Sequence, residues 1–99
     1  MKLQMHSIHF DVDVKLKDFA QKKIDKLEKL YDRVIDGEVF FRLENVDTRD
    51  NKIIEVKLNI PGSQLFAKEK SNTFEAATDE AVEALRRQLK KFKEKQIEH

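Results

Sequence analysis

The chain has 99 residues, of which 39% are charged and 39% are hydrophobic, and its formal net charge is +1 at pH 7. This length predicts one domain with a modest core, and the regular placement of apolar residues excludes a disordered chain. The absence of cysteine excludes disulfides and cysteine metal sites, and no apolar segment approaches a membrane span. We therefore expect a cytoplasmic protein with no membrane partner.

The first third of the chain predicts a short strand followed by a long helix. Residues 2–5 alternate between polar and apolar side chains, and residues 7–13 form a connection. Asp13 can cap the helix, because its carboxylate accepts hydrogen bonds from the free amides of the first turn. Apolar residues then recur at steps of three and four up to Tyr31, which predicts a helix of about five turns. Asp36–Gly37 has the residue types of a turn and marks the end of this segment.

The middle of the chain changes from helical to strand periodicity. Apolar and polar residues alternate over residues 39–44, 53–60 and 65–70, which predicts three further strands. Polar turns at residues 47–51 and 61–63 separate them. Such short connections make these strands antiparallel, whereas the helical crossover allows the first strand to run parallel to the second.

The last segment of the chain predicts a second amphipathic helix. Asn72 and Glu75 have the spacing of a capping box. The apolar residues that follow form one helical stripe: Phe74, Ala77, Ala81, Val82, Leu85, Leu89 and Phe92. Because each strand has one apolar face, both helices must cover the same face of the sheet. We therefore predict an α+β fold, a β-α-β-β-β-α two-layer sandwich with a four-stranded mixed sheet and one face open to solvent.

The residues that usually carry catalysis or hold metal ions are scattered along the chain. None of the three histidines has a partner at a metal-binding spacing, and the pair Asp11 and Asp13 lacks the glycine and glutamate of a calcium loop. The two glycines do not form a phosphate-binding loop, and no serine has an activating partner in the sequence. We expect no catalytic residue, no metal and no cofactor, and a protein that is not an enzyme.

The strongest functional signal is the segment Arg86–Lys95, in which six of ten residues are cationic and one is anionic. Helical spacing divides its cations into two rows, which are Arg86, Lys90 and Lys93, and Arg87, Lys91 and Lys95. Lysines of the first helix also lie outside its apolar stripe: Lys15, Lys22, Lys26 and Lys29. If the two helices pack side by side, these rows form one basic surface that matches the phosphates of a nucleic acid.

Two other interpretations stay open at this point. Cations near the C-terminus of a helix complement its dipole, by about 0.3–1 kcal/mol each, so the segment is also typical of a stable, solvated helix. Alternatively, the chain is a protein-interaction module that uses the open sheet face and makes no RNA contact. Phe40 and Phe66 are expected on that face, where they would contact a partner or stack on bases.

The order of the elements, the length and two segments resemble one known family. The segments are Leu27–Arg33 and Ala76–Lys91, and the second contains the pattern Leu-x-Arg-Gln-Leu-x-Lys. Over essentially the whole chain they are similar to the ribosome hibernation promoting factors, also called ribosome-associated inhibitor or sigma-54 modulation proteins. By its length the chain resembles a short form, and we expect neither the additional C-terminal domain of the long-form members nor the acidic tail of the purely inhibitory ones.

The resemblance implies a fold similar to double-stranded RNA-binding domains, with residues 1–99 as a single ribosome-binding domain. It implies binding to the small ribosomal subunit, to ribosomal RNA and ribosomal proteins, in the channel for messenger and transfer RNA. Translation would be inhibited in starved or stationary-phase cells, and in some bacteria a second hibernation factor acts with the short form to promote ribosome dimers. The RNA-binding residues that it implies are Lys22, Lys23, Lys26, Lys29, Arg86, Arg87, Lys90, Lys91, Lys93 and Lys95.

Overall fold

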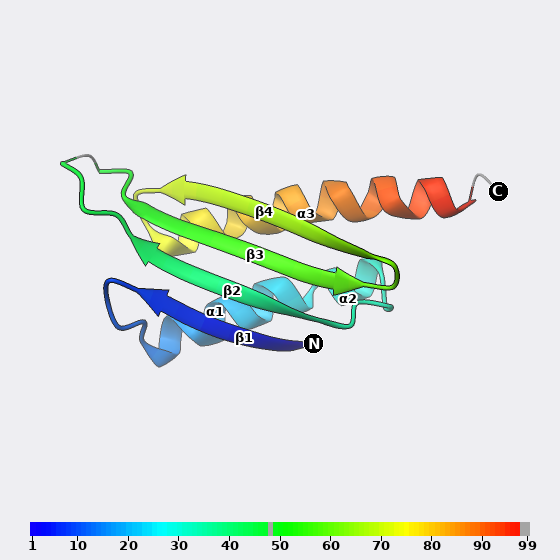
Figure 1. Cartoon of the computed structure of the whole chain (residues 1–99), viewed down its shortest axis with the longest axis horizontal. Coiled ribbons are helices and arrows are strands. Elements are labelled where there is room, and N and C mark those ends of the chain that lie inside the picture. The colour runs from blue at the N-terminus through cyan, green and yellow to red at the C-terminus, as the bar shows by residue number, and fades with distance from the viewer. Residues whose placement is uncertain (48, 98–99) are drawn as a thin grey trace.

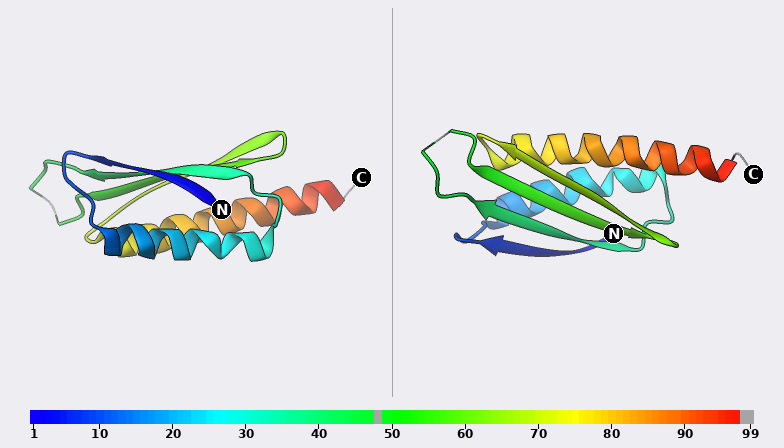
Figure 2. Two further views of the ribbon diagram at one scale, coloured as in Figure 1. Left: turned by 90° about the horizontal axis from the view of Figure 1, so that it is seen from below. Right: turned by 45° about the horizontal axis from the view of Figure 1, so that its top comes forward.

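The computed structural model describes residues 1–47 and 49–97, and within them four strands form one sheet in the order β1-β2-β3-β4 (Figure 1). The elements are β1 (Lys2–Ile8), α1 (Val14–Asp25), α2 (Leu27–Leu30), β2 (Asp36–Leu43), β3 (Lys52–Ile60), β4 (Ser63–Ser71) and α3 (Phe74–Ile97). β1 pairs parallel with β2, and the other neighbours are antiparallel. The helices cover one face of the sheet and leave the other open (Figure 2). The predicted β-α-β-β-β-α sandwich is confirmed.

The hydrophobic core lies between the sheet and the helices. Alternate residues of three strands point into it, as the period of two predicted: Val39, Phe41, Ile54, Val56, Leu58, Ile60, Leu65 and Ala67. The predicted stripe of α3 packs against them, with Phe74 and Phe92 half-buried at its two ends. The core also contains Thr78, whose hydroxyl donates to the carbonyl oxygen of Phe74 at 2.7 Å and so is buried without loss of its hydrogen bond.

The first helix is shorter than predicted and is divided in two. α1 ends at Asp25, Lys26 interrupts the regular helix, and α2 continues to Leu30. Tyr31 has an extended backbone with φ −150°, and its N–H donates to the carbonyl oxygen of Leu27 at 3.0 Å, which closes α2. The apolar spacing continues through the interruption because the same side stays buried, so periodicity alone does not reveal it.

Side chains cap the starts of both long helices. Asp13 caps α1 as predicted, and its Oδ1 accepts a hydrogen bond from the backbone N–H of Leu16 at 2.8 Å. The predicted cap of the last helix was wrong by one residue. Thr73, and not Asn72, accepts a hydrogen bond from the N–H of Ala76 at 3.0 Å through its Oγ1. In a capping box, the residue three positions after the cap accepts a hydrogen bond from the backbone N–H of the cap residue. With Thr73 as the cap this residue is Ala76, whose side chain has no acceptor, so the predicted capping box does not form.

The two glycines have different roles, one in a turn and one inside a strand. Gly62 forms a turn with Pro61 and has φ 76°, a conformation that glycine adopts without strain. The predicted turn at Asp36–Gly37 was wrong, because these residues begin β2. A Cβ at Gly37 would lie 2.6 Å from the carbonyl oxygen of Lys57 and 2.7 Å from Cδ2 of Leu58. Glycine is needed there for close packing inside the sheet. β1 is also longer than predicted, because it pairs with β2 as far as Ile8.

Candidate nucleic-acid interface

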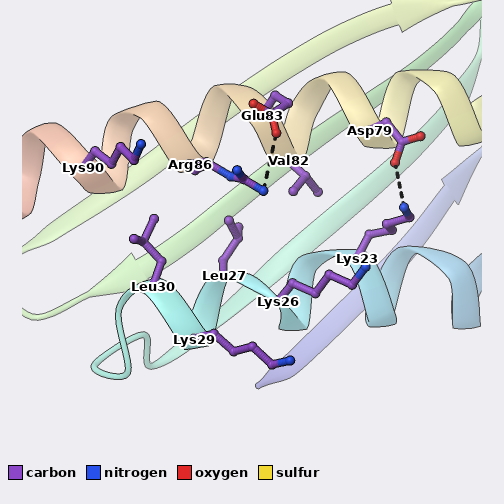
Figure 3. A pocket seen from close by; sticks show the side chains of 10 residues that line it. All are labelled: Lys23, Lys26, Leu27, Lys29, Leu30, Asp79, Val82, Glu83, Arg86 and Lys90. Atoms are coloured by element: carbon purple, nitrogen blue, oxygen red, sulfur yellow. Dashed lines mark ion pairs between the residues drawn. The ribbon is translucent and has the colours of Figure 1, made fainter.

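We call α1, Lys26 and α2 together the first helical segment. A groove between this segment and α3 brings together five of the predicted RNA-binding cations (Figure 3). Lys23 is on α1, Lys26 lies between α1 and α2, and Lys29 is on α2. Arg86 and Lys90 are on α3. We call this the interhelical groove, and its lining residues are Lys23, Lys26, Leu27, Lys29, Leu30, Asp79, Val82, Glu83, Arg86 and Lys90. The two helical segments therefore pack side by side, as the predicted basic surface requires.

The core determines which side chains line the groove. Ile24 and Leu27 are buried under the first helical segment, and this fixes its rotation about its own axis. On α3, Leu85 and Leu89 are fully buried and fix that helix in the same way. The residues next to these anchors therefore stand at the rim, where a cation keeps its charged group in water.

Two carboxylates also line the groove, and each binds one cation. Asp79 Oδ1 lies 3.4 Å from Nζ of Lys23, and Glu83 Oε1 lies 3.5 Å from Nη2 of Arg86. In the part of the chain that the structure describes, no ion pair involves the three remaining groove cations, Lys26, Lys29 and Lys90. The groove therefore carries an excess of free positive charge.

The acidic residues that interleave the lysines of the first helical segment do not line the groove. Asp25 Oδ1 lies 2.9 Å from the amino group of Met1, and Glu28 binds the same group through Oε1. Hydrogen bonds to Glu28, and then to Asp25, raise the pKa of the Met1 amino group above its ordinary value. Gln21 Nε2 donates to Oδ1 of Asp25 at 2.9 Å and holds that carboxylate in place. These two negative charges are bound at the start of β1 and do not pair with the groove lysines.

Four of the predicted RNA-binding cations lie outside the groove and are exposed. Lys22 is on α1, whereas Arg87 and Lys91 line a shallow hollow on another flank of α3. Lys95 is in the last turn of α3, where it complements the helix dipole. Because α3 continues to Ile97, the dipole accounts for Lys95 but not for cations two or three turns earlier. The interpretation of the basic segment as simple dipole matching therefore explains only its end.

The tenth predicted cation, Lys93, has a structural role that sequence reasoning missed. Its Nζ donates a hydrogen bond of 2.7 Å to the carbonyl oxygen of Leu30, the last residue of α2. Beside this bond, the rings of Tyr31 and Phe92 pack edge to face with centroids 5.7 Å apart. Lys93 thus joins α3 to the end of α2 and holds the two sides of the groove together. No local pattern links residues so far apart in the sequence.

Gln88, inside the same basic segment, binds the edge of the sheet. Its Nε2 donates to the carbonyl oxygen of Phe66 at 2.7 Å, and its Oε1 accepts from the N–H of Phe66 at 3.3 Å. The side-chain amide therefore pairs with β4 as a neighbouring strand would. This contact occupies Gln88 and covers part of the exposed strand edge.

The open sheet face carries the two aromatic residues expected there. The ring of His6 stacks on Phe40 with centroids 4.8 Å apart, and Nζ of Lys57 lies 5.4 Å from the centroid of the Phe40 ring. Phe66 is 44% exposed. Because His6 and Lys57 already contact Phe40, Phe66 is the one aromatic residue among the described residues of this face that offers a large free surface.

Charged residues of the open face form ion pairs across strands. Glu55 Oε1 lies 3.9 Å from Nη2 of Arg42 and 3.8 Å from Nζ of Lys68. Glu44 Oε2 lies 3.0 Å from Nζ of Lys70. The cations of this face are therefore largely balanced within the sheet.

Residues 1–47 and 49–97 contain neither a metal-binding cluster nor a membrane-spanning helix. No group of three or more histidine, aspartate or glutamate side chains is placed to hold a metal ion there. No helix among these residues is long and apolar enough to cross a membrane. The basic groove is thus the feature of the described structure that requires a functional explanation.

Known proteins match almost the whole chain. The family described as Sigma 54 modulation protein / S30EA ribosomal protein matches residues 3–97. A ribosome hibernation promoting factor of Azotobacter vinelandii is 33% identical over 98 residues, which cover 99% of this chain and 88% of the relative. The ribosome hibernation promoting factor of Escherichia coli (strain K12) is 27% identical over 99 residues and is covered completely, as is this chain.

Solved structures share the fold. A ribosomal subunit interface protein from Coxiella burnetii has a TM-score of 0.82 at 24% identity, with 94% of this chain and 98% of that chain covered. The N-terminal domain of Protein Y from Thermus thermophilus has a TM-score of 0.80 at 22% identity, with 93% and 99% covered. The matching family and relatives are named for the ribosome and not for a catalysed reaction, and the chain, as predicted, is not an enzyme. The chain belongs to the Sigma 54 modulation protein / S30EA ribosomal protein family, the family of the ribosome hibernation promoting factors.

Proposed function

We propose that the protein binds the small ribosomal subunit in the channel for messenger and transfer RNA, through ribosomal RNA, and inhibits translation in starved or stationary-phase cells. The observation that carries the proposal is the interhelical groove, in which Lys26, Lys29 and Lys90 are free to bind phosphates. Family membership supports the ribosome as the partner, because the relatives are named ribosome hibernation promoting factors and a structural neighbour is named a ribosomal subunit interface protein.

The charge distribution favours RNA over a general polyanion surface. The net charge is only +1, so long-range attraction is weak and binding depends on cations that a local surface concentrates. Each phosphate that such a cation neutralises releases bound counterions, and this release drives association. Lysines on two adjacent helices present charge along a line, which suits a phosphate backbone better than a compact anion.

The proposed mechanism is occlusion and needs no chemical step. The molecule measures 49 × 23 × 19 Å, an elongated body whose bound helices would occupy the space that messenger and transfer RNA need. Ribosomal proteins near the channel would complete the contact, and the binding would take place in the cytoplasm. Promotion of ribosome dimers would require a second hibernation factor.

The alternative, a protein-interaction module on the open sheet face, has less support. Its best observation is the exposed ring of Phe66, but the neighbouring charges are paired and Phe40 is already covered. Nuclease treatment separates the two functions, because a protein partner would stay bound after the RNA is digested.

Sucrose-gradient sedimentation tests the proposal. The purified protein is mixed with small subunits, with whole ribosomes or with nuclease-treated subunits at physiological salt, and its position in the gradient is followed. We expect it to travel with intact small subunits, to dissociate as salt is raised, and to inhibit a cell-free translation reaction. A protein that stays at the top of the gradient with intact subunits contradicts the proposal. Addition of a second hibernation factor tests whether a dimer peak forms.

A further inference from the structure

The interhelical groove is electrically divided along its length. Over the first half of α3, two cations lie beside two carboxylates, in the pairs Lys23–Asp79 at 3.4 Å and, near the middle of the helix, Arg86–Glu83 at 3.5 Å. Toward α2, the lining contains Lys26, Lys29 and Lys90, for which the described residues provide no ion pair. Figure 3 shows the Lys23–Asp79 pair at one end of the groove, Lys90 and Lys29 toward the other end, near Leu30, and the Arg86–Glu83 pair between them, above Leu27. One end is therefore neutral and the other is cationic.

The stability of the fold does not explain the two carboxylates. The helix dipole favours acidic residues in the first turn of α3, and that position belongs to Glu75. Asp79 and Glu83 lie one and two turns further on and are 55% and 54% exposed. Ion pairs so exposed contribute little to stability, because water and salt screen them. Their main physical effect is on the charge that the groove presents to a ligand.

We propose that Asp79 and Glu83 determine where RNA phosphates bind in the groove. A phosphate near Lys23 or Arg86 would also lie near a carboxylate, which repels it and competes for the same cation. A phosphate at the α2 end meets three cations without this competition. The two carboxylates thus confine the backbone to the α2 end and limit the number of phosphates that the groove neutralises. This inference rests on the proposed function, since it concerns the same RNA.

Neutral variants test the division, with small ribosomal subunits as the probe. Glu83→Gln frees Arg86, and Asp79→Asn frees Lys23. Each added phosphate contact steepens the log–log salt dependence of binding by about 0.7–0.9 and raises affinity by up to about eightfold at 0.1 M salt. The matched control is Glu80→Gln, which changes the net charge equally on the same helix but lies outside the groove. It should leave the slope unchanged.

Affinity is measured by fluorescence anisotropy of the labelled protein between about 50 and 200 mM salt, a range over which phosphate contacts change affinity strongly. Steeper slopes for Glu83→Gln and Asp79→Asn than for Glu80→Gln support the inference. If all three variants behave alike while the wild-type protein binds with a clear salt dependence, the inference is overturned and the proposed function stands. If the wild-type protein does not bind, the proposed function fails and the inference fails with it. Circular dichroism confirms that each variant is folded.

Discussion

The two faces of the sheet carry charge in different ways. On the open face, Glu55 of β3 is shared by Arg42 and Lys68 of its two neighbouring strands, and Glu44, just after β2, binds Lys70 of β4. On the helical face, the buried stripes fix the helices so that lysines from two helices meet across a groove, and three of them lack a carboxylate among the described residues. A chain of net charge +1 thus has one balanced face and one cationic face. Arrangement, and not net charge, decides which face can bind RNA.

The difference between the two faces is tested most directly by neutralising lysines on each face in turn. The triple variant Lys26→Gln, Lys29→Gln, Lys90→Gln should lose about three phosphate contacts, so its affinity for small subunits should fall by roughly two to three orders of magnitude at 0.1 M salt. The control variant Lys57→Gln, Lys68→Gln, Lys70→Gln changes the net charge equally on the open face and should bind almost normally. Salt-dependent anisotropy measures both. Equal losses would mean that net charge, and not the groove, drives binding.

A variant of Lys93 tests whether this cation stabilises the groove and does not itself bind RNA. Lys93→Met removes the hydrogen bond to the Leu30 carbonyl oxygen, and loss of a bond from a charged donor costs about 1.5–3 kcal/mol of stability. Lys95→Met changes the charge equally at an exposed position and should stay within about 0.5 kcal/mol of the wild type. Urea unfolding measures both. If the two variants were equally stable, the contact with Leu30 would not hold α2 in place.

Much of the fold follows from patterns that are local in the sequence. Strict alternation over residues 54–60 reflects a strand with one buried face, and the three- and four-residue steps of α3 reflect one buried stripe. The errors fall where a tertiary contact overrides a local preference. Asp36–Gly37 is typical of a turn, yet Gly37 pairs with Leu3 and Leu58 inside the sheet, where a Cβ would clash with β3. The interruption at Lys26 leaves the buried side unchanged and so leaves no trace in the pattern.

The sequence predicted which lysines and arginines belong to the candidate site, but it did not predict how they are arranged around the groove. Helical spacing indicates which side of its own helix a lysine occupies, and it does not indicate what faces that side. The pairing of Lys23 with Asp79, and the bond from Lys93 to Leu30, depend on how two distant helices pack together. For the same reason, sequence spacing placed Lys93 and Lys90 in one row, although one is structural and the other is free in the groove.

Gln88 offers a smaller test within the same basic segment. Gln88→Met keeps the size of the side chain but removes both hydrogen bonds to Phe66 on β4. Because these bonds are partly open to water, we expect a loss of about 1 kcal/mol in urea unfolding, with unchanged affinity for small subunits. The uncovered edge of β4 should also favour self-association, which sedimentation velocity detects. A loss of RNA affinity without a loss of stability would instead make Gln88 a direct contact.

We expect the smallest effect on RNA binding from a variant of the open face, and this variant tests whether the helical face alone contacts RNA. Glu55→Gln removes the carboxylate shared by Arg42 and Lys68, at distances of 3.9 and 3.8 Å, and surface pairs of this kind contribute less than about 1 kcal/mol each. The variant frees two cations, as Glu83→Gln frees one in the groove. If only the helical face contacts RNA, the salt dependence of small-subunit binding should not change. A slope steeper by about one unit would place the open face against phosphates as well, and the separation of the two faces would then be wrong.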